Sequence, residues 1–167
     1  MSRILPVDDD IDHLKLFTII LDNKGYSVDT YTDSVTALSK FKRNYYDIIL
    51  LDYRMPNPNG LELYALIREI DPTAKALLLT ANHEQFTDGK QIEGQDCLRV
   101  ITKSISNEKL LADVESTLNQ PIASVSLENY DRSHQKLLLI VSEKGIKSLH
   151  KKPVLHNREH NTKEDFK

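Results

Sequence analysis

The sequence lacks several features that mark particular classes of protein. Among its 167 residues there is one cysteine, Cys97, and there is no tryptophan. A single cysteine excludes an internal disulfide and a cysteine-based zinc site, and because it fits a reducing compartment we expect a cytoplasmic protein. The longest unbroken apolar run, Leu137 to Val141, is far shorter than the ~20 residues that span a bilayer. Three aspartates follow the first seven residues at once, so we expect no signal peptide.

What is present fits one soluble domain with a short extension. Hydrophobic residues make up 40% and charged residues 28%, the profile of a globular protein. Residues 1–119 carry 13 Lys and Arg against 19 Asp and Glu, whereas residues 120–167 carry 9 against 6. Pro121 follows the last helix-like pattern. We therefore expect a domain over 1–119 and a partly disordered extension over 120–167, whose role the sequence does not indicate.

Strand-like and helix-like patterns alternate through the first 119 residues. Short buried or alternating runs predict five strands, over 3–7, 26–31, 48–51, 76–79 and 98–102. Apolar residues at helical spacing predict five helices, with their apolar faces within 14–21, 37–41, 61–70, 86–94 and 110–118. Asp33 or Ser34 can cap the second helix, and Ser106 can cap the last. This order predicts an α/β fold with a doubly wound parallel sheet.

Polar residues follow four of the predicted strands. The run Asp8 to Asp10 follows the first, Asp52 the third, Thr80 the fourth and Lys103 the fifth. In such sheets, chemistry lies beyond the carboxyl ends of the strands. Clustered carboxylates repel one another and need a cation, and all-oxygen ligands completed by water favour Mg²⁺. With a lysine and a hydroxyl beside them they suit a phosphoryl group, which an aspartate can accept as an acyl phosphate.

These residues lie in motifs that resemble the receiver domain of two-component response regulators, the CheY-like receiver family. The motifs are Ile4 to Asp10, then Asp47 to Pro56 with Gly60, then Leu79 to Ala81, then Thr102-Lys103. The resemblance covers about residues 2–119. It implies a flavodoxin-like sheet with strand order 2-1-3-4-5.

The resemblance also implies a metal site for Mg²⁺. Asp9 and Asp52 would bind the ion directly, and the backbone carbonyl of Arg54 would complete the protein ligands. Asp8 would act mainly through a metal-bound water.

In the same family, a phosphoryl group is the signal. Asp52 would be the phosphoacceptor, Lys103 would contact the phosphoryl group, and Thr80 would hydrogen-bond it after transfer. The donor would be a phosphohistidine on a sensor histidine kinase. The phosphorylated protein would switch its binding to a downstream target that the sequence does not identify. The sequence also leaves open whether the protein forms a homodimer. We expect a signalling domain that assists its own phosphorylation and dephosphorylation, not a metabolic enzyme.

Four residues deserve separate expectations. Pro6 lies inside the first strand, where it lacks a donor, so we expect a local distortion there. Ser104 stands where the family usually has proline, and we expect it to hold Lys103 less firmly. Val100 stands where many members carry an aromatic ring, so we expect no ring movement on the fifth strand. Gly60 is expected to serve a left-handed turn before a helix.

Two other functions remain open from the residues. A haloacid-dehalogenase-like phosphatase also uses a parallel sheet, Mg²⁺ and an aspartate nucleophile, and Asp8 with Asp10 is similar to its first motif. A degenerate receiver that accepts no phosphate would act only as an interaction module, an alternative that Pro6 and Ser104 keep open.

The extension carries weaker signals. His150, His156 and His160 match no compact metal motif, and acidic residues interrupt the basic cluster near Lys151 and Lys152, which argues against a nucleic-acid partner. The run Leu137 to Val141 is the expected contact for partners or association. Cys97 is expected to be a small buried hydrophobic residue.

Overall fold

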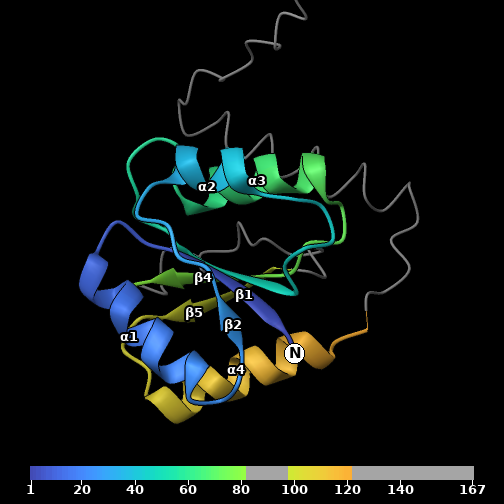
Figure 1. Cartoon of the computed structure of the whole chain (residues 1–167). Helices are drawn as coiled ribbons and strands as arrows, with labels where there is room; N and C mark the ends of the chain where they lie inside the picture. Colours follow the sequence, from blue (N-terminus) through green and yellow to red (C-terminus); the bar gives the residue numbers. More distant parts are fainter. Residues whose placement is uncertain (82–97, 122–167) are drawn as a thin grey trace, which may run out of the picture.

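The computed structural model describes residues 1–81 and 98–121, which form a parallel sheet between two layers of helices (Figure 1). The sheet has the order β2-β1-β3-β4-β5, so the predicted fold class and strand order are confirmed. The strands are β1 (Arg3–Val7), β2 (Ser27–Val28), β3 (Ile48–Asp52), β4 (Ala76–Thr80) and β5 (Leu98–Thr102). The helices are α1 (Ile11–Asp22), α2 (Ser34–Lys40), α3 (Gly60–Ile70) and α4 (Asn107–Asn119). The predicted helix over 86–94, Cys97, the run Leu137 to Val141 and the histidines of the extension lie outside the described residues.

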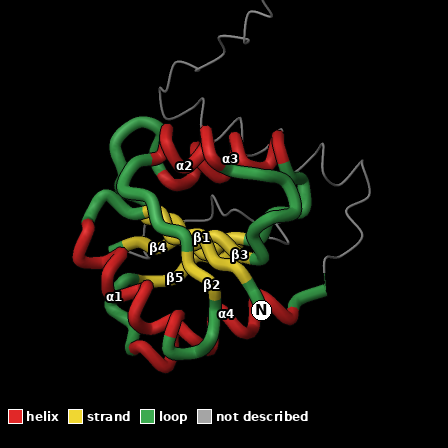
Figure 2. Tube along the Cα trace, viewed as in Figure 1, coloured by secondary structure: helices red, strands yellow, loops and turns green. Residues whose placement is uncertain are grey.

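The sheet is buried on both faces. Helices α1 and α4 cover one face, and α2 and α3 cover the other (Figure 2). Every residue of β3 and β4 is buried, as expected for the central strands of a doubly wound sheet. Side chains alternate between the two cores: Leu50 contributes to the α1 and α4 side, and Leu51 contributes to the α2 and α3 side. This packing fixes where each strand ends, and with it the position of the polar residues that follow.

Pro6 affects the edge of the sheet and not its centre. Strand β1 pairs with β3 in unbroken register from Ile4 to Val7, so the expected distortion of β1 is not found. The carbonyl of Pro6 accepts from Tyr31 N at 3.1 Å, which shows that this residue faces β2. The N–H that proline lacks would therefore have pointed to the edge strand. This explains why β2 is only two residues long, shorter than the predicted 26–31, with one isolated bridge at Tyr31.

Short polar side chains begin the helices at the ends of the loops. Asp33, one of the two candidates for the second helix, accepts from Thr36 N at 2.7 Å, and Ser106 accepts from Lys109 N at 3.2 Å. Asp10 caps α1 by accepting from Asp12 N at 2.8 Å. Because α1 starts so soon after β1, its first turn stands directly over the carboxyl end of that strand.

Candidate functional site

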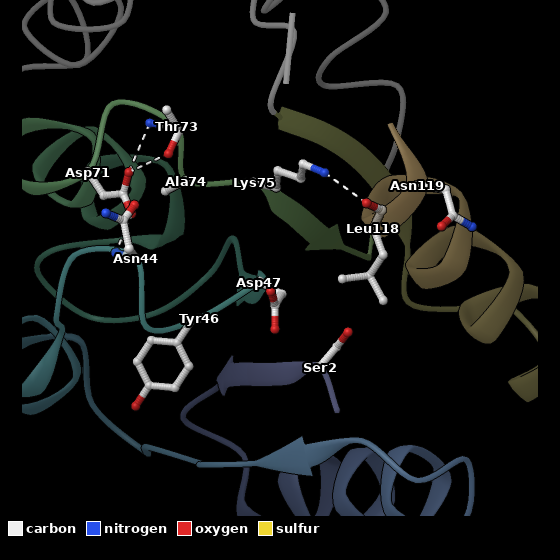
Figure 3. Close-up of a pocket in the computed structure, with 10 residues that line it drawn as sticks. All are labelled: Ser2, Asn44, Tyr46, Asp47, Asp71, Thr73, Ala74, Lys75, Leu118 and Asn119. Carbon is white, nitrogen blue, oxygen red and sulfur yellow. Dashed lines mark hydrogen bonds between the residues drawn. The ribbon is translucent and has the colours of Figure 1, made fainter. Parts of the chain in front are cut away.

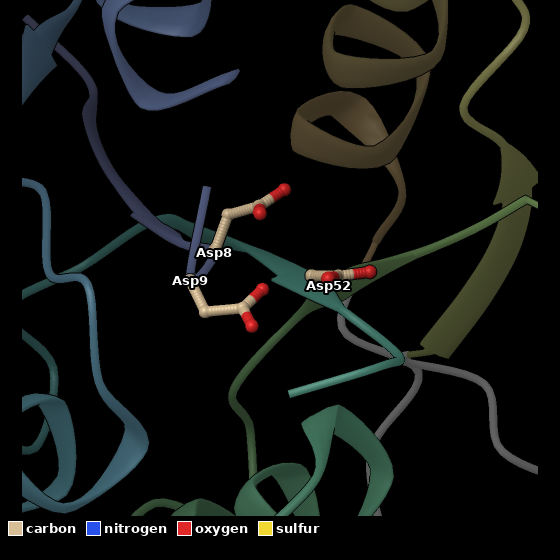
Figure 4. A group of neighbouring side chains, drawn as sticks. All are labelled: Asp8, Asp9 and Asp52. Carbon is tan, nitrogen blue, oxygen red and sulfur yellow. The ribbon is translucent and has the colours of Figure 1, made fainter. Parts of the chain in front are cut away.

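Three aspartates meet at the carboxyl edge of the two neighbouring strands β1 and β3. Asp8 and Asp9 directly follow β1, and Asp52 is the last residue of β3. One carboxylate oxygen from each lies within 4.8 Å of the others (Figure 4). The structure therefore brings together three of the residues that the sequence predicted for the site.

Burial separates the three carboxylates into two kinds. Asp8 is 1% exposed and Asp52 is 4% exposed, whereas Asp9 is exposed. Ionised carboxylates buried this deeply need a positive partner or strong hydrogen bonds. Asp9 has no hydrogen-bond or ion-pair partner within residues 1–81 and 98–121, so its charge is available to a ligand.

Lys103 supplies the positive partner. Its Nζ lies 2.9 Å from Asp8 Oδ2 and 3.1 Å from Asp52 Oδ1. Partial burial would lower the pKa of the ammonium, but the hydrogen bonds to Asp8 and Asp52 outweigh it and raise the pKa of Lys103 above its ordinary value. The lysine is therefore held charged between the two buried carboxylates.

The backbone of Lys103 is held as well. Its N–H donates to the carbonyl of Thr80 at 2.8 Å, which joins the ends of β4 and β5. Thr80 itself is fully buried, one residue beyond the β4 partner of Asp52. Both ends of the lysine therefore have partners, and a looser hold on Lys103 through Ser104 stays a prediction. Val100 is partly buried and packs against the core on the α2 and α3 side, and no ring stands at this place in β5.

Local backbone contacts fix the two buried carboxylates. Asp8 Oδ1 accepts from Asp10 N at 2.9 Å, and Asp52 Oδ1 accepts from Arg54 N at 3.2 Å. Arg54 is exposed, and its carbonyl as a metal ligand remains a prediction. These bonds come from turns of two residues after each strand, so the sequence orients each carboxylate as soon as the strand ends.

Gly60 supports Asp52 by close approach and not by an unusual backbone angle. A side-chain Cβ at this position would overlap the backbone carbonyl of Asp52. Among the described glycines the positive φ belongs to Gly25, so the expected left-handed turn at Gly60 is wrong. Glycine is required because α3 begins against the end of β3. A capping box between Asn59 and Glu62 starts the helix at this place.

The sequence analysis missed one residue of the site, His13. Its Nδ1 lies 3.2 Å from Asp8 Oδ2 and 3.3 Å from Lys103 Nζ. The available signal was the cap at Asp10, which places residue 13 in the first turn of a helix that starts over the end of β1.

A second polar region lies at the opposite, amino end of the sheet. A pocket of about 340 Å³ is lined there by residues that precede β1, β3 and β4 and by the end of α4 (Figure 3). Asp71 and Lys75 from this region bond to backbone groups: Asp71 accepts from Asn44 N at 2.9 Å, and Lys75 Nζ donates to Leu118 O at 2.9 Å. These hydrogen bonds link the loops before β3 and β4 and join the start of β4 to the end of α4. The polar groups at this end of the sheet therefore hold secondary-structure elements together.

The residues at the carboxyl end fit a hard metal ion. The three carboxylates offer only oxygen ligands, and Lys103 balances just one of their charges. Hard divalent cations such as Mg²⁺ prefer this kind of site and keep several waters. The cluster could therefore hold such an ion.

Known proteins with similar sequences are response regulators. A family model described as the response regulator receiver domain matches residues 4–115. The transcriptional regulatory protein CpxR homolog of Haemophilus influenzae is 30% identical, over 78% of this chain and 59% of that protein. The response regulator ArlR of Staphylococcus saprophyticus is 32% identical, over 72% of this chain and 54% of that protein. The chain thus spans less than three fifths of either relative.

Solved structures of response regulator proteins have the same fold as this chain. The response regulator protein TrrA from Thermotoga maritima, in complex with Mg²⁺ and BeF, is 32% identical with a TM-score of 0.60, covering 70% of this chain and 99% of that chain. The BeF₃-activated DrrB receiver domain is 28% identical with a TM-score of 0.61 and covers 72% and 99%. Among the described residues, no helix is long and apolar enough to cross a membrane. The sheet order, the carboxylate cluster and the family match lead to one assignment: this chain belongs to the response regulator receiver domain family.

Proposed function

We propose that the protein is the phosphoacceptor of a two-component phosphorelay, with Asp52 as the residue that is phosphorylated. The observation that carries this proposal is the buried Asp52 carboxylate, bonded to Lys103 and within 4.8 Å of two further carboxylates. An aspartate oxygen attacks the phosphorus of a phosphohistidine, the P–N bond breaks, and an acyl phosphate forms on the aspartate. A sensor histidine kinase is the proposed donor. A cytoplasmic location is part of the same proposal.

Mg²⁺ is the proposed cofactor, held by Asp9 and Asp52, with the Arg54 carbonyl as a further ligand and Asp8 acting through water. When bound, it would offset the negative charge that builds up around the transferring phosphoryl group. Lys103 would contact a phosphoryl oxygen, and Thr80 would donate its hydroxyl to the phosphoryl group after transfer. The family match favours this function over a haloacid-dehalogenase-like phosphatase, in which Asp8 would be the nucleophile.

The test is the intact mass of the full chain after incubation with a small acyl phosphate, with and without Mg²⁺. The expected result is a gain of one phosphoryl group that requires Mg²⁺ and is abolished in Asp52→Asn. Asp47→Asn is the matched control, because Asp47 lies just before the other end of β3, where it accepts from Arg3 N. This control should gain the phosphoryl group as the wild type does.

Two outcomes would contradict the proposal. Incorporation at an unchanged rate in Asp52→Asn would make another residue the acceptor. No incorporation in the wild type, together with no binding of Mg²⁺ and beryllofluoride, would indicate a degenerate receiver that acts as an interaction module.

We also propose that residues 1–119 are the phosphoaccepting unit and that residues 120–167 serve partners or association, including a homodimer. Because Lys75 Nζ also donates to Gln120 O at 2.7 Å, the sharpest test is a fragment ending at Pro121. It should unfold cooperatively and accept phosphate at close to the full-length rate. A fragment that is unfolded would show that the extension belongs to the core.

A further inference from the structure

A single ring nitrogen of His13 lies within hydrogen-bond distance of two charged groups of the site, and Asp10 Oδ2 lies farther from the same nitrogen, at 3.7 Å. Nδ1 lies 3.2 Å from Asp8 Oδ2 and 3.3 Å from Lys103 Nζ. An imidazole nitrogen carries either a proton, which it donates, or a lone pair, which accepts. Nδ1 can therefore donate to Asp8 or accept from Lys103, but it cannot do both at once.

Asp8 Oδ2 depends on these two neighbours. Asp8 is 1% exposed, and its other oxygen already accepts from Asp10 N. Oδ2 receives Lys103 Nζ at 2.9 Å. If Lys103 turned from Asp8 to a phosphoryl group on Asp52, Oδ2 would lose its ammonium partner in a place that bulk water barely reaches. A carboxylate oxygen accepts about two hydrogen bonds, so the metal-bound water proposed for Asp8 would fill only one position, and an acceptor position left buried and unfilled is disfavoured.

His13 lies where it can replace Lys103 as the hydrogen-bond donor to Asp8 Oδ2. The ring is anchored in the first turn of α1, at 6.4 Å from the ring of the buried Phe17, and it is already within hydrogen-bond distance of Oδ2. We propose that His13 is a positioning residue of the phosphotransfer site, whose Nδ1–H donates to Asp8 Oδ2 when Lys103 moves to the phosphoryl group. This inference rests on the proposed function of Asp52 and Lys103.

The experiment compares the phosphorylation rates of the full chain at saturating Mg²⁺ and saturating small acyl phosphate. His13→Leu removes the donor and should lower the rate about tenfold, as expected for one lost hydrogen bond to a charged group. His13→Asn places an amide nitrogen at the position of Nδ1 and should stay within about threefold of the wild type. The Mg²⁺ concentration for half-maximal rate should change by less than about threefold in both variants, because Lys103 still donates to Asp8 before transfer and the bond from His13 is needed only during transfer.

Lys15→Leu is the matched control on the same helix. Lys15 is exposed and bonds to Asp12 at the surface, so its loss should leave the rate unchanged. An unchanged rate in His13→Leu, or an equal loss in His13→Leu and His13→Asn, would overturn the positioning role and leave the proposed function intact. A wild type that takes up no phosphate would overturn both.

Discussion

The two ends of the sheet both carry buried acids, but they treat them differently. At the amino end, the Asp71 carboxylate accepts three hydrogen bonds, from the N–H of Asn44 and from the N–H and hydroxyl of Thr73. At the carboxyl end, Asp8 and Asp52 share the one ammonium of Lys103. At the amino end, neutral hydrogen-bond donors surround the buried charge of Asp71. At the carboxyl end, three carboxylates lie close together beside one ammonium group.

We infer that this difference separates acids that stabilise the fold from acids that can bind a ligand. A carboxylate surrounded by donors stabilises the fold and has no capacity left for a ligand. Carboxylates held close together repel one another, and a bound cation would relieve the repulsion that Lys103 leaves. The comparison therefore predicts opposite effects when acids are removed from the two ends.

The largest expected effect is on metal binding at the carboxyl end. Asp9→Ala should weaken Mg²⁺ binding about 100-fold, because an exposed carboxylate with no described partner is the strongest candidate for direct coordination. Asp8→Ala should weaken it less, about tenfold, because Asp8 is engaged with Lys103 and His13. Calorimetric titration with Mg²⁺ measures both. Equal losses in the two variants would reject this ranking.

The next effect is on stability at the amino end. Asp71→Asn should lower the free energy of unfolding by about 1–3 kcal/mol at pH 7, because an amide cannot accept all three of these hydrogen bonds. Burial acts to raise the pKa of Asp71, but the bonds from Asn44 and Thr73 outweigh it and lower the pKa below its ordinary value. A lowered folded-state pKa gives stability that is complete above the unfolded value of about 3.9 and is lost as pH falls through the folded pKa.

Urea unfolding of Asp71→Asn and wild type from pH 7 downward checks this prediction. The difference between the two should shrink on acidification. A difference that is constant with pH would mean that packing, and not the charge, makes Asp71 stabilising.

The sequence predicted the carboxyl end better than the amino end, and the reason is physical. Five polar residues lie at or just beyond the carboxyl ends of strands with apolar patterns, and parallel strands bring these ends to one edge. Asp52 and Thr80 are the last residues of their strands, and the others follow theirs: Asp8, Asp9 and Lys103. The structure places them there, while their roles in phosphorylation and metal binding stay predictions. The edge strand was harder, because the length of β2 depends on a donor that Pro6 lacks on another strand.

Contacts between distant segments could not be predicted from local patterns. Lys75 reaches carbonyls 43 and 45 residues away, and His13 meets Lys103 across 90 residues. Neither pairing leaves a periodic signal. The overlap that requires Gly60 likewise depends on how α3 packs against the end of β3.

A third prediction sharpens the structural role of the amino end. Lys75→Met should lower the free energy of unfolding by about 1 kcal/mol, because it removes the donor that holds the carbonyls of Leu118 and Gln120 at the end of α4. The methionine keeps most of the apolar stem. Lys15→Met, at an exposed surface pair, is the control and should change stability much less. Equal losses of stability in Lys75→Met and Lys15→Met, measured by thermal unfolding, would show that the bonds from Lys75 to the end of α4 stabilise the fold no more than an exposed ion pair does.

The smallest expected effect is a change in the melting midpoint, and its sign distinguishes a ligand-binding acid from a structural one. Without Mg²⁺, Asp9→Asn should raise the melting midpoint by about 2 °C, because one like charge leaves a crowded cluster and no described partner is lost. With saturating Mg²⁺ the order should reverse. The wild type gains stability from the bound ion in proportion to the logarithm of its concentration over the dissociation constant, and the variant gains little. Differential scanning calorimetry at both conditions measures this crossing. If Asp9→Asn is less stable than the wild type without the metal, Asp9 is a structural acid like Asp71, and the distinction between the two ends of the sheet fails at this residue.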